Sequence, residues 1–191
     1  MRTTRQIMVG RVAVGGGAPV SIQSMTNTPT GDADAALAQI GRLARLGCDI
    51  VRVALPSSAE IDGFARICVE SPLPVVADIH FDHRLALAAM TAGAACIRIN
   101  PGNMKDEGKV RQVARAAAAA GCAVRIGVNG GSLAPAVRER LGHGPAALVE
   151  SALQYACWFE EEGCRALKVS LKSSDVRVTV AACREFAARS D

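Results

Sequence analysis

Residues 124–131 read VRIGVNGG, and the fold can be predicted from the pattern in this stretch. An alanine-rich helical segment precedes it and a polar turn follows, which predicts a buried β-strand that nevertheless contains Arg125. A buried guanidinium without a partner is costly, so Arg125 should meet either an acid or a ligand. Side chains two residues apart lie on the same face of a strand. Arg125, Gly127 and Asn129 should therefore share one polar face, opposite an apolar one.

The same alternation of strand and helix recurs along the chain. Apolar, β-rich runs are found at residues 20–25, 50–55, 75–80, 96–100, 124–129 and 166–172. Amphipathic helical patterns follow them at residues 32–47, 57–69, 82–93, 107–121, 133–163 and 175–189. Several of these patterns end in a glycine, which is typical of a left-handed cap. Alternating strands and helices form a parallel sheet. We predict six βα units, preceded by a short N-terminal β-hairpin within residues 5–17.

The polar face decides between the two architectures that βα units can build. The same two-residue alternation, applied to each strand, places on this face Arg52, Asp78, His80, Arg98, Asn100, Gly127, Asn129, Lys168, Ser170 and Lys172, together with Arg125. An open doubly wound sheet is covered by helices on both faces and should be apolar on both. A barrel has one interior, and its polar groups gather at the carboxyl ends of the strands. The sequence therefore predicts an α/β fold of the TIM-type (β/α)8 barrel class.

The predicted barrel is incomplete. A TIM barrel typically has eight units in about 250 residues, whereas this sequence supplies six units in 191 residues. We interpret residues 1–191 as a partial TIM-barrel domain, a fragment or a truncated product. The first and sixth strands would then have unpaired edges, which favour association with other chains.

The composition excludes several other classes of protein. Half of the residues are hydrophobic and 21% are charged, which is enough for one core and argues against disorder. The net charge of +4 is scattered and aromatic residues make up only 3%, so a nucleic-acid surface is not expected. No apolar run approaches the roughly 20 residues of a membrane span, and the N-terminus lacks the apolar core of a signal peptide. We predict a cytoplasmic protein that does not bind a membrane.

Cations outnumber acids on the predicted inner face. Its strand residues include one acid, Asp78, and five cations, namely Arg52, Arg98, Arg125, Lys168 and Lys172. Guanidinium groups bind phosphate oxygens bidentately, so this surplus indicates a polyanionic ligand such as a diphosphate. Internal ion pairing is the alternative. The turns at residues 100–103 and 129–132 could add backbone amides to the anion site. His80 could be a proton donor, a metal ligand, a donor to the substrate or a structural histidine.

Six strings of the sequence resemble one known family, the 4-hydroxy-3-methylbut-2-enyl diphosphate synthases of the non-mevalonate (MEP) isoprenoid pathway. They are QSMTNT (23–28), DIVRV (49–53), VADIHFD (76–82), RINPGN (98–103), RIGVN followed by GGSL (125–133) and KVSLKSSDV (168–176). The resemblance runs from about residue 5 to the end of the sequence. It implies a barrel that binds 2-C-methyl-D-erythritol 2,4-cyclodiphosphate and an oxidoreductase reaction, the reductive ring opening and dehydration of that substrate.

The resemblance also implies roles for individual residues. Carried over by position, the diphosphate would be held by Arg52, Arg98, Arg125, Asn129 and Lys172. The pocket would also be lined by Asp78, His80 and Asn27. Lys168 lies on the same face of the strand as Lys172 but deeper in the barrel. We therefore rank it below Lys172 as a candidate ligand of the diphosphate. No residue of this chain is assigned as catalytic.

The cofactor and partners implied by the resemblance lie largely outside this sequence. The family has a C-terminal [4Fe-4S] domain, absent from this chain, in which three cysteines and a glutamate hold the cluster. It takes electrons from flavodoxin or ferredoxin and forms a homodimer. The seven cysteines here show no such spacing, and the four at strand entrances are predicted to be small buried hydrophobes, namely Cys48, Cys96, Cys122 and Cys164. We therefore expect no metal or cluster in this chain and no activity from it alone.

Two other functions remain open at this stage. The first is a non-redox phosphate-binding barrel enzyme, such as a dihydropteroate-synthase-like transferase or a Schiff-base aldolase that uses Lys172. The second is a non-catalytic barrel remnant that only binds or dimerises.

Overall fold

A computed structural model of the chain describes residues 4–190. Strands β1 (Ile7–Val9) and β2 (Val12–Val14) pair as an antiparallel hairpin, as the sequence predicts. The hairpin is followed by a parallel sheet in the order β3-β4-β5-β6-β7-β8. These strands are β3 (Gln23–Met25), β4 (Ile50–Ala54), β5 (Val75–Asp78), β6 (Cys96–Ile99), β7 (Ala123–Asn129) and β8 (Leu167–Lys172).

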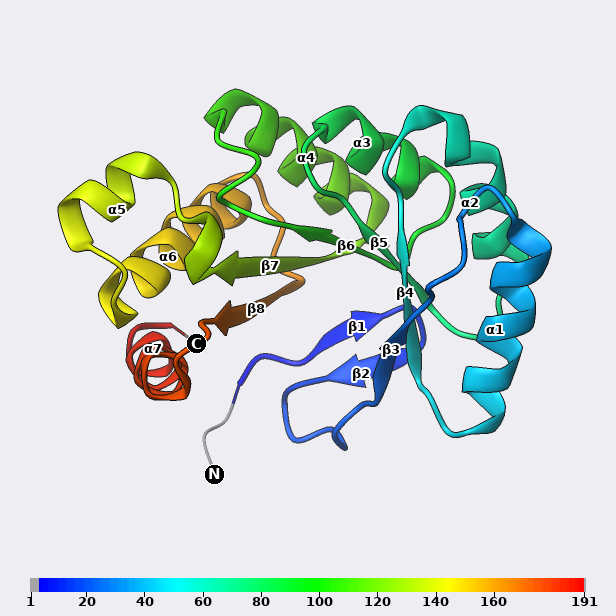
Figure 1. The fold of residues 1–191 in the computed structure, drawn as a ribbon, viewed down its shortest axis with the longest axis horizontal. Helices are drawn as coiled ribbons and strands as arrows, with labels where there is room; N and C mark the ends of the chain where they lie inside the picture. Colours follow the sequence, from blue (N-terminus) through cyan, green and yellow to red (C-terminus); the bar gives the residue numbers. More distant parts are fainter. Residues whose placement is uncertain (1–3, 191) are drawn as a thin grey trace.

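The sheet is strongly curved, and helices cover its convex side (Figure 1). The helices are α1 (Ala33–Arg45), α2 (Ile61–Glu70), α3 (His83–Thr91), α4 (Glu107–Ala120), α5 (Pro135–Leu141), α6 (Pro145–Glu161) and α7 (Val176–Arg189), with short 3-10 turns η1 (Ser58–Glu60) and η2 (Gly130–Ser132). The strand order follows the chain order, as in a TIM barrel. The fold is an incomplete barrel, in which β3 and β8 each pair with a single neighbour within the described residues.

Local sequence signals set the ends of the helices. The side chains of four aspartates accept the first free amides of α1, α3, α4 and α7, namely Asp32, Asp82, Asp106 and Asp175. Glycines with positive φ follow α1, α3, α4 and α6, namely Gly47, Gly93, Gly121 and Gly163. The predicted glycine caps are therefore confirmed.

The apolar face of the strands packs against the helices. Fully buried residues on this face include Val51, Val53, Ile97, Ile99 and Ile126, which belong to one core with residues of the helices. The two-residue alternation seen in VRIGVNGG therefore predicts the polar and apolar faces of the strands correctly. The polar face is left on the concave side of the sheet, where the site lies.

Two expected elements differ from the structure. The first strand begins at Gln23 rather than Val20, because residues 20–22 precede the paired region and Val20 is 95% exposed. The long helical segment from 133 to 163 is two helices, since Pro135 and Pro145 each begin a helix and Gly142 ends the first one.

The hairpin closes the amino-terminal end of the barrel interior. Ile7 and Val9 of β1 pack with the inward-facing residues at the starts of β4 to β7, namely Ile50, Val76, Cys96 and Ala123. In Figure 1 the hairpin lies between β8 and β3. An apolar floor therefore lies beneath the polar interior. The part of the chain described by the structure contains no helix that is both long enough and apolar enough to cross a membrane.

Candidate functional site

One row of the sheet brings four ionisable side chains to the same level. Asp78, Arg98, Arg125 and Lys168 lie in register on the adjacent strands β5, β6, β7 and β8. Adjacent strands are about 4.8 Å apart, so these side chains are neighbours on the concave face. Arg52 lies beside this row on β4, in register with Val76, the second residue before Asp78.

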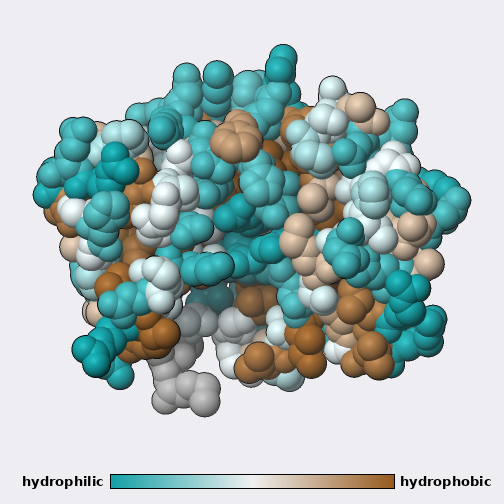
Figure 2. Space-filling model, viewed as in Figure 1, coloured by the Kyte–Doolittle hydropathy of each residue, from teal (hydrophilic) through white to brown (hydrophobic). Residues whose placement is uncertain are grey.

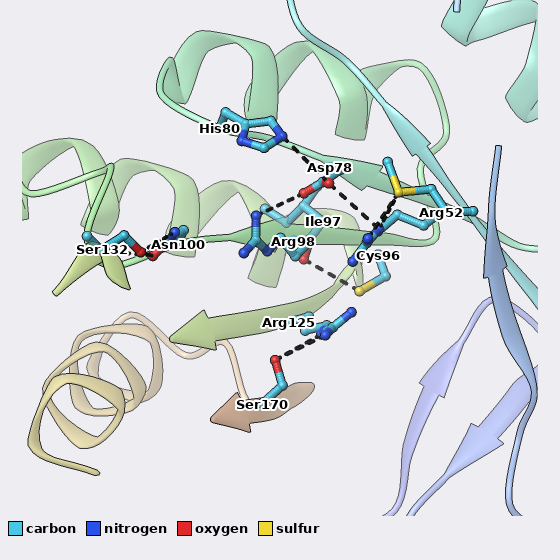
Figure 3. Close-up of polar contacts among 12 residues, drawn as sticks. Arg52, Asp78, His80, Cys96, Ile97, Arg98, Asn100, Arg125, Ser132 and Ser170 are labelled. Carbon is cyan, nitrogen blue, oxygen red and sulfur yellow. Dashed lines mark hydrogen bonds and ion pairs between the residues drawn. The ribbon is translucent and has the colours of Figure 1, made fainter. Parts of the chain in front are cut away.

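Asp78 is the centre of the charged cluster. Its carboxylate is 4% exposed and accepts a hydrogen bond from Arg98 Nη1 at 3.2 Å. The second oxygen, Oδ2, lies 3.6 Å from Arg52 Nε and 3.7 Å from His80 Nε2. Figure 3 shows Asp78 between Arg98 and Arg52. One carboxylate thus orients two arginines but can compensate only one positive charge.

Arg52 has a second, uncharged support. Its Nε and Nη2 lie 3.1 and 3.0 Å from the thioether sulfur of Met25 on the edge strand β3. A thioether is a weak acceptor and carries no charge. Met25 therefore helps to hold the guanidinium group of Arg52 in place without neutralising its positive charge.

Arg98 lies over a glycine of the neighbouring strand. A Cβ atom added to Gly127 would stand 2.9 Å from Arg98 Nε and 3.3 Å from Nη2. The Nε atom is buried and has no hydrogen-bond partner among the described residues. Gly127 thus provides the space that the guanidinium occupies. This explains the glycine in VRIGVNGG, a role that sequence analysis did not identify.

Arg125 and Lys168 form no ion pair with an acid among the described residues. Arg125 Nε and Nη2 lie 3.2 and 3.1 Å from Ser170 Oγ, and within residues 4–190 no carboxylate is within 4 Å of either cation. Burial lowers the pKa of Arg125, and the nearby Arg52 and Arg98 lower it further. Burial also lowers the pKa of Lys168, with a smaller contribution from Arg125. Both cations are therefore in surroundings that favour a bound anion.

A cavity of about 770 Å³ opens beside these cations. Its lining combines β3, β4, β7 and β8 and includes Gln23, Ser24, Met25, Arg52, Arg125, Lys168 and Ser170. Figure 2 shows hydrophilic residues gathered in the middle of this face of the molecule. The lining contains three cations and no acid. The contributions of Gln23 and of the Met25 thioether were not predicted, although their strand was.

The other predicted site residues lie nearer the carboxyl ends of the strands. His80 follows β5, and its side chain is 47% exposed. Asn129 and Lys172 end β7 and β8, lie in register and are exposed. Asn27 is also exposed, and its backbone amide donates to Gln39 on α1. The structure places these four at the mouth of the barrel, and within residues 4–190 the one ion-pair contact that joins them to Asp78 and its arginines is that of His80 with Asp78.

The two glycine turns are packed together rather than open to a ligand. Asn100 Nδ2 donates to Ser132 Oγ at 2.9 Å, and Gly102 has no room for a side chain against the Ser132 backbone. The amides of Gly102 and Gly131 donate to the side chains of Asn100 and Asn129. From the sequence we expect both turns to present free backbone amides to an anion. For the amides of Gly102 and Gly131 this expectation is wrong. Each asparagine side chain satisfies an amide within its own turn.

Helix α6 holds the first of these turns in place. The hydroxyl of Tyr155 is buried, donates to the carbonyl of Met104 and lies 3.2 Å from the carbonyl of Pro101. Burial raises the pKa of this phenol well above its usual range. Tyr155 therefore ties the β6–α4 connection to the core as a neutral donor.

Metal ligands are not grouped in the described part of the chain. Residues 4–190 contain no cluster of three or more His, Cys, Asp or Glu side chains placed to hold a metal ion. Burial raises the pKa of Cys68 and Cys122 to about 12, and of Cys164 to about 11. These thiols are thus protonated at neutral pH, as expected for small buried hydrophobes.

Comparisons with known proteins agree with this geometry. Residues 4–191 match the model of the GcpE TIM-barrel domain. The chain is 52% identical over 192 aligned positions to the 4-hydroxy-3-methylbut-2-en-1-yl diphosphate synthase (flavodoxin) of Nocardia farcinica, and 50% identical to that of Corynebacterium jeikeium. The Mycobacterium tuberculosis protein of the same name is 52% identical. Each alignment covers 100% of this chain but 50% of the relative, so the chain spans about half the length of the curated relatives it matches.

Solved structures support the fold independently. The chain superposes on phospho-2-dehydro-3-deoxyheptonate aldolase of Thermotoga maritima with a TM-score of 0.67 at 11% identity, over 95% of this chain and 52% of the other. It superposes on dihydropteroate synthase of Yersinia pestis with a TM-score of 0.62 at 12% identity, over 86% and 62% of the two chains. At such low identity the likeness concerns the fold only.

Proposed function

This chain belongs to the GcpE TIM-barrel family, and we propose that it is the substrate-binding part of a 4-hydroxy-3-methylbut-2-en-1-yl diphosphate synthase. The names of its relatives indicate an oxidoreductase with flavodoxin as the electron donor. The observation that best supports a diphosphate ligand is the charged row (Asp78, Arg98, Arg125 and Lys168) with Arg52 beside it, in which one buried carboxylate accompanies four cations. A surplus of buried positive charge needs a compensating anion.

The proposed substrate is 2-C-methyl-D-erythritol 2,4-cyclodiphosphate, which undergoes reductive ring opening and loss of water. Arg52, Arg98 and Arg125 provide forked N–H donors for its diphosphate oxygens. Asp78 orients two of these arginines through contacts of 3.2 and 3.6 Å. Asp78 is therefore a positioning residue in this proposal, as well as part of the pocket wall.

The residues at the mouth complete the proposed pocket. Lys172 brings an exposed ammonium group to the outer end of the site. Asn129 uses its side-chain oxygen for the amide of Gly131, which leaves its NH₂ group as a donor for the substrate. His80 and Asn27 would contact the substrate from the ends of neighbouring strands.

The [4Fe-4S] cluster of the family is assigned no ligands in this chain. The cysteines in the described residues are dispersed and largely buried, and they do not fit a cluster site. We therefore derive no step through the cluster. The proposal extends to flavodoxin or ferredoxin as electron donor, and flavodoxin in the names of the relatives supports the former. It also extends to a homodimer.

Binding of the cyclic diphosphate by the purified protein and by its Arg125→Met variant tests the proposal. Removing one charge-assisted donor should weaken binding by roughly tenfold to a hundredfold, since such a hydrogen bond contributes about 1.5–3 kcal/mol. Arg66→Met is the matched control, because Arg66 pairs with Asp34 and Glu70 on the helical surface. Equal affinity of the Arg125 and Arg66 variants would contradict the proposed role of the charged row.

A further inference from the structure

Arg125 is held in a different way from the other two arginines of the site. Arg52 and Arg98 contact the carboxylate of Asp78, at 3.6 and 3.2 Å. In the part of the chain that the structure describes, the guanidinium of Arg125 has one hydrogen-bond partner, the hydroxyl of Ser170, which lies 3.2 Å from Nε and 3.1 Å from Nη2. Figure 3 shows this contact between the adjacent strands β7 and β8. The direction of the Arg125 side chain therefore depends on a neutral hydroxyl group.

The contact between Arg125 and Ser170 runs diagonally across the two strands. Lys168 is directly opposite Arg125, whereas Ser170 is opposite Gly127. Each residue of a parallel strand rises about 3.3 Å, so Ser170 lies about 6–7 Å nearer the carboxyl end of β8 than Lys168. Ser170 thus holds the charged end of Arg125 on the side that faces the mouth of the barrel, where Lys172 lies, rather than on the side of Lys168.

This hydroxyl keeps Arg125 in place against the cations around it. Arg52 and Arg98 lower the pKa of Arg125, which means that they repel its positive charge. Lys168 adds to the repulsion, because like charges directly opposite each other on adjacent strands are unfavourable. An ion pair with an acid would hold the guanidinium but neutralise it. Ser170 holds it through two hydrogen bonds and leaves the charge for a ligand.

The two hydrogen bonds leave part of the guanidinium free. The N–H donors of an arginine form a rigid fork in one plane. Ser170 accepts from the N–H of Nε and from one N–H of Nη2. The N–H groups of Nη1 and the second N–H of Nη2 remain, and such a pair suits two phosphate oxygens. Because Arg125 and Ser170 both line the cavity of about 770 Å³, these donors are accessible to an anion that enters it.

We propose that Ser170 is a positioning residue, whose hydroxyl fixes the plane of the Arg125 guanidinium before a phosphate group binds. This inference rests on the proposed function and adds a residue to it. An arginine that is already ordered loses less conformational freedom when the ligand binds, which increases affinity. In this role Ser170 acts through Arg125 and not through a contact of its own with the ligand. Asn129 and Lys172 keep their proposed roles at the mouth.

Titration of the purified protein with inorganic pyrophosphate tests this assignment. Ser170→Ala should weaken binding about threefold to tenfold, because Arg125 must then become ordered during binding. Ser170→Thr should bind within about twofold of the unmodified protein, because it restores a hydroxyl and suits a β-strand. Ser71→Ala is the matched control, since the Ser71 hydroxyl also makes two hydrogen bonds, both with Leu73, and lies outside the cavity lining. Its affinity for pyrophosphate should be unchanged.

A second measurement shows whether Ser170 acts through Arg125. In Arg125→Met the guanidinium is absent, so adding Ser170→Ala should weaken pyrophosphate binding by less than about threefold. A larger loss in that background would mean that Ser170 acts independently of Arg125, and it would overturn the inference. The inference would also be overturned by a loss of less than about threefold in Ser170→Ala alone, by an equal loss in Ser71→Ala, or by no recovery in Ser170→Thr.

A parallel titration with the cyclic diphosphate separates this inference from the proposed function. If the protein binds pyrophosphate but not the cyclic diphosphate, the proposed substrate is wrong, and the pyrophosphate titrations still decide the role of Ser170. If the protein binds both ligands and the Ser170 variants bind them normally, only the inference about Ser170 fails. If the unmodified protein binds neither ligand, both the proposed function and the inference are wrong.

Discussion

Replacing Gly127 by alanine should impair ligand binding much more than folding. The new Cβ would stand 2.9 Å from Arg98 Nε and 3.5 Å from Cζ. Unstrained contacts between such atoms are about 3.5 Å or longer, so the guanidinium must move by about 0.6 Å. It can move because it is the far end of a flexible side chain. The movement disturbs the hydrogen bond from Arg98 Nη1 to Asp78.

The cost in stability should be small. Gly127 lies within the extended strand β7 and does not have a positive φ, so alanine suits its backbone. Restricting the unfolded chain contributes about 0.4–1 kcal/mol, which offsets part of an overpacking cost of about 1–3 kcal/mol. The net loss in the free energy of unfolding should lie between about 0 and 2.6 kcal/mol. The loss in binding should be about tenfold to a hundredfold if one charge-assisted hydrogen bond to the ligand is lost.

A double-mutant cycle gives the sharpest measurement. Pyrophosphate affinity would be measured for Gly127→Ala, Arg98→Met and the double variant, with urea unfolding of each. If Gly127 acts through Arg98, the alanine should have no further effect once Arg98 is removed. Gly41→Ala adds a methyl group on α1, where the nearest atom is 3.7 Å away, and is the control. The reasoning would be refuted if Gly127→Ala lowered pyrophosphate affinity equally in the unmodified protein and in Arg98→Met. Unchanged affinity in the single variant Gly127→Ala would refute it as well.

Three further predictions concern the rest of the chain. Gly102→Ala would overlap the carbonyl of Ser132; we expect a loss of about 3 kcal/mol and a melting temperature lower by roughly 6–12 °C in a thermal scan. Tyr155→Phe removes the hydroxyl that holds the β6–α4 connection; its urea midpoint should fall by an amount equivalent to about 1 kcal/mol, with an unchanged slope. Iodoacetamide at pH 8 should modify the exposed Cys183 before Cys157, because a hydrogen bond to Glu161 raises the pKa of Cys157; the reverse order in peptide mapping would contradict this.

The sequence was sufficient to predict the barrel because side-chain parity is a local property. The polar residues of VRIGVNGG lie two apart, and the same spacing in the other strands assigns each side chain to a face without knowledge of the register. The excess of cations over acids on the inner face follows from the same assignment of side chains to faces. The hairpin was also predictable, since Gly10 separates two short apolar runs.

The supports of the arginines could not be predicted in this way. Met25 and Ser170 contact guanidinium groups of neighbouring strands, and such contacts depend on the register of the sheet. The internal hydrogen bonds of the two asparagine turns are local, and the spacing of Asn100 and Gly102 is a signal that could have identified them.

The apolar layers around the site explain how a sheet can contain so many cations. The aliphatic stems of arginine and lysine can pack on apolar surface while their charged ends remain in the cavity. The floor provided by Ile7, Val9 and the first inward residues of the strands offers such a surface. It also excludes water from part of the side of the charged row that faces the hairpin. Because less water surrounds the row, its attraction for an anion entering from the mouth is stronger. Residues of the hairpin therefore contribute to ligand affinity without touching the ligand.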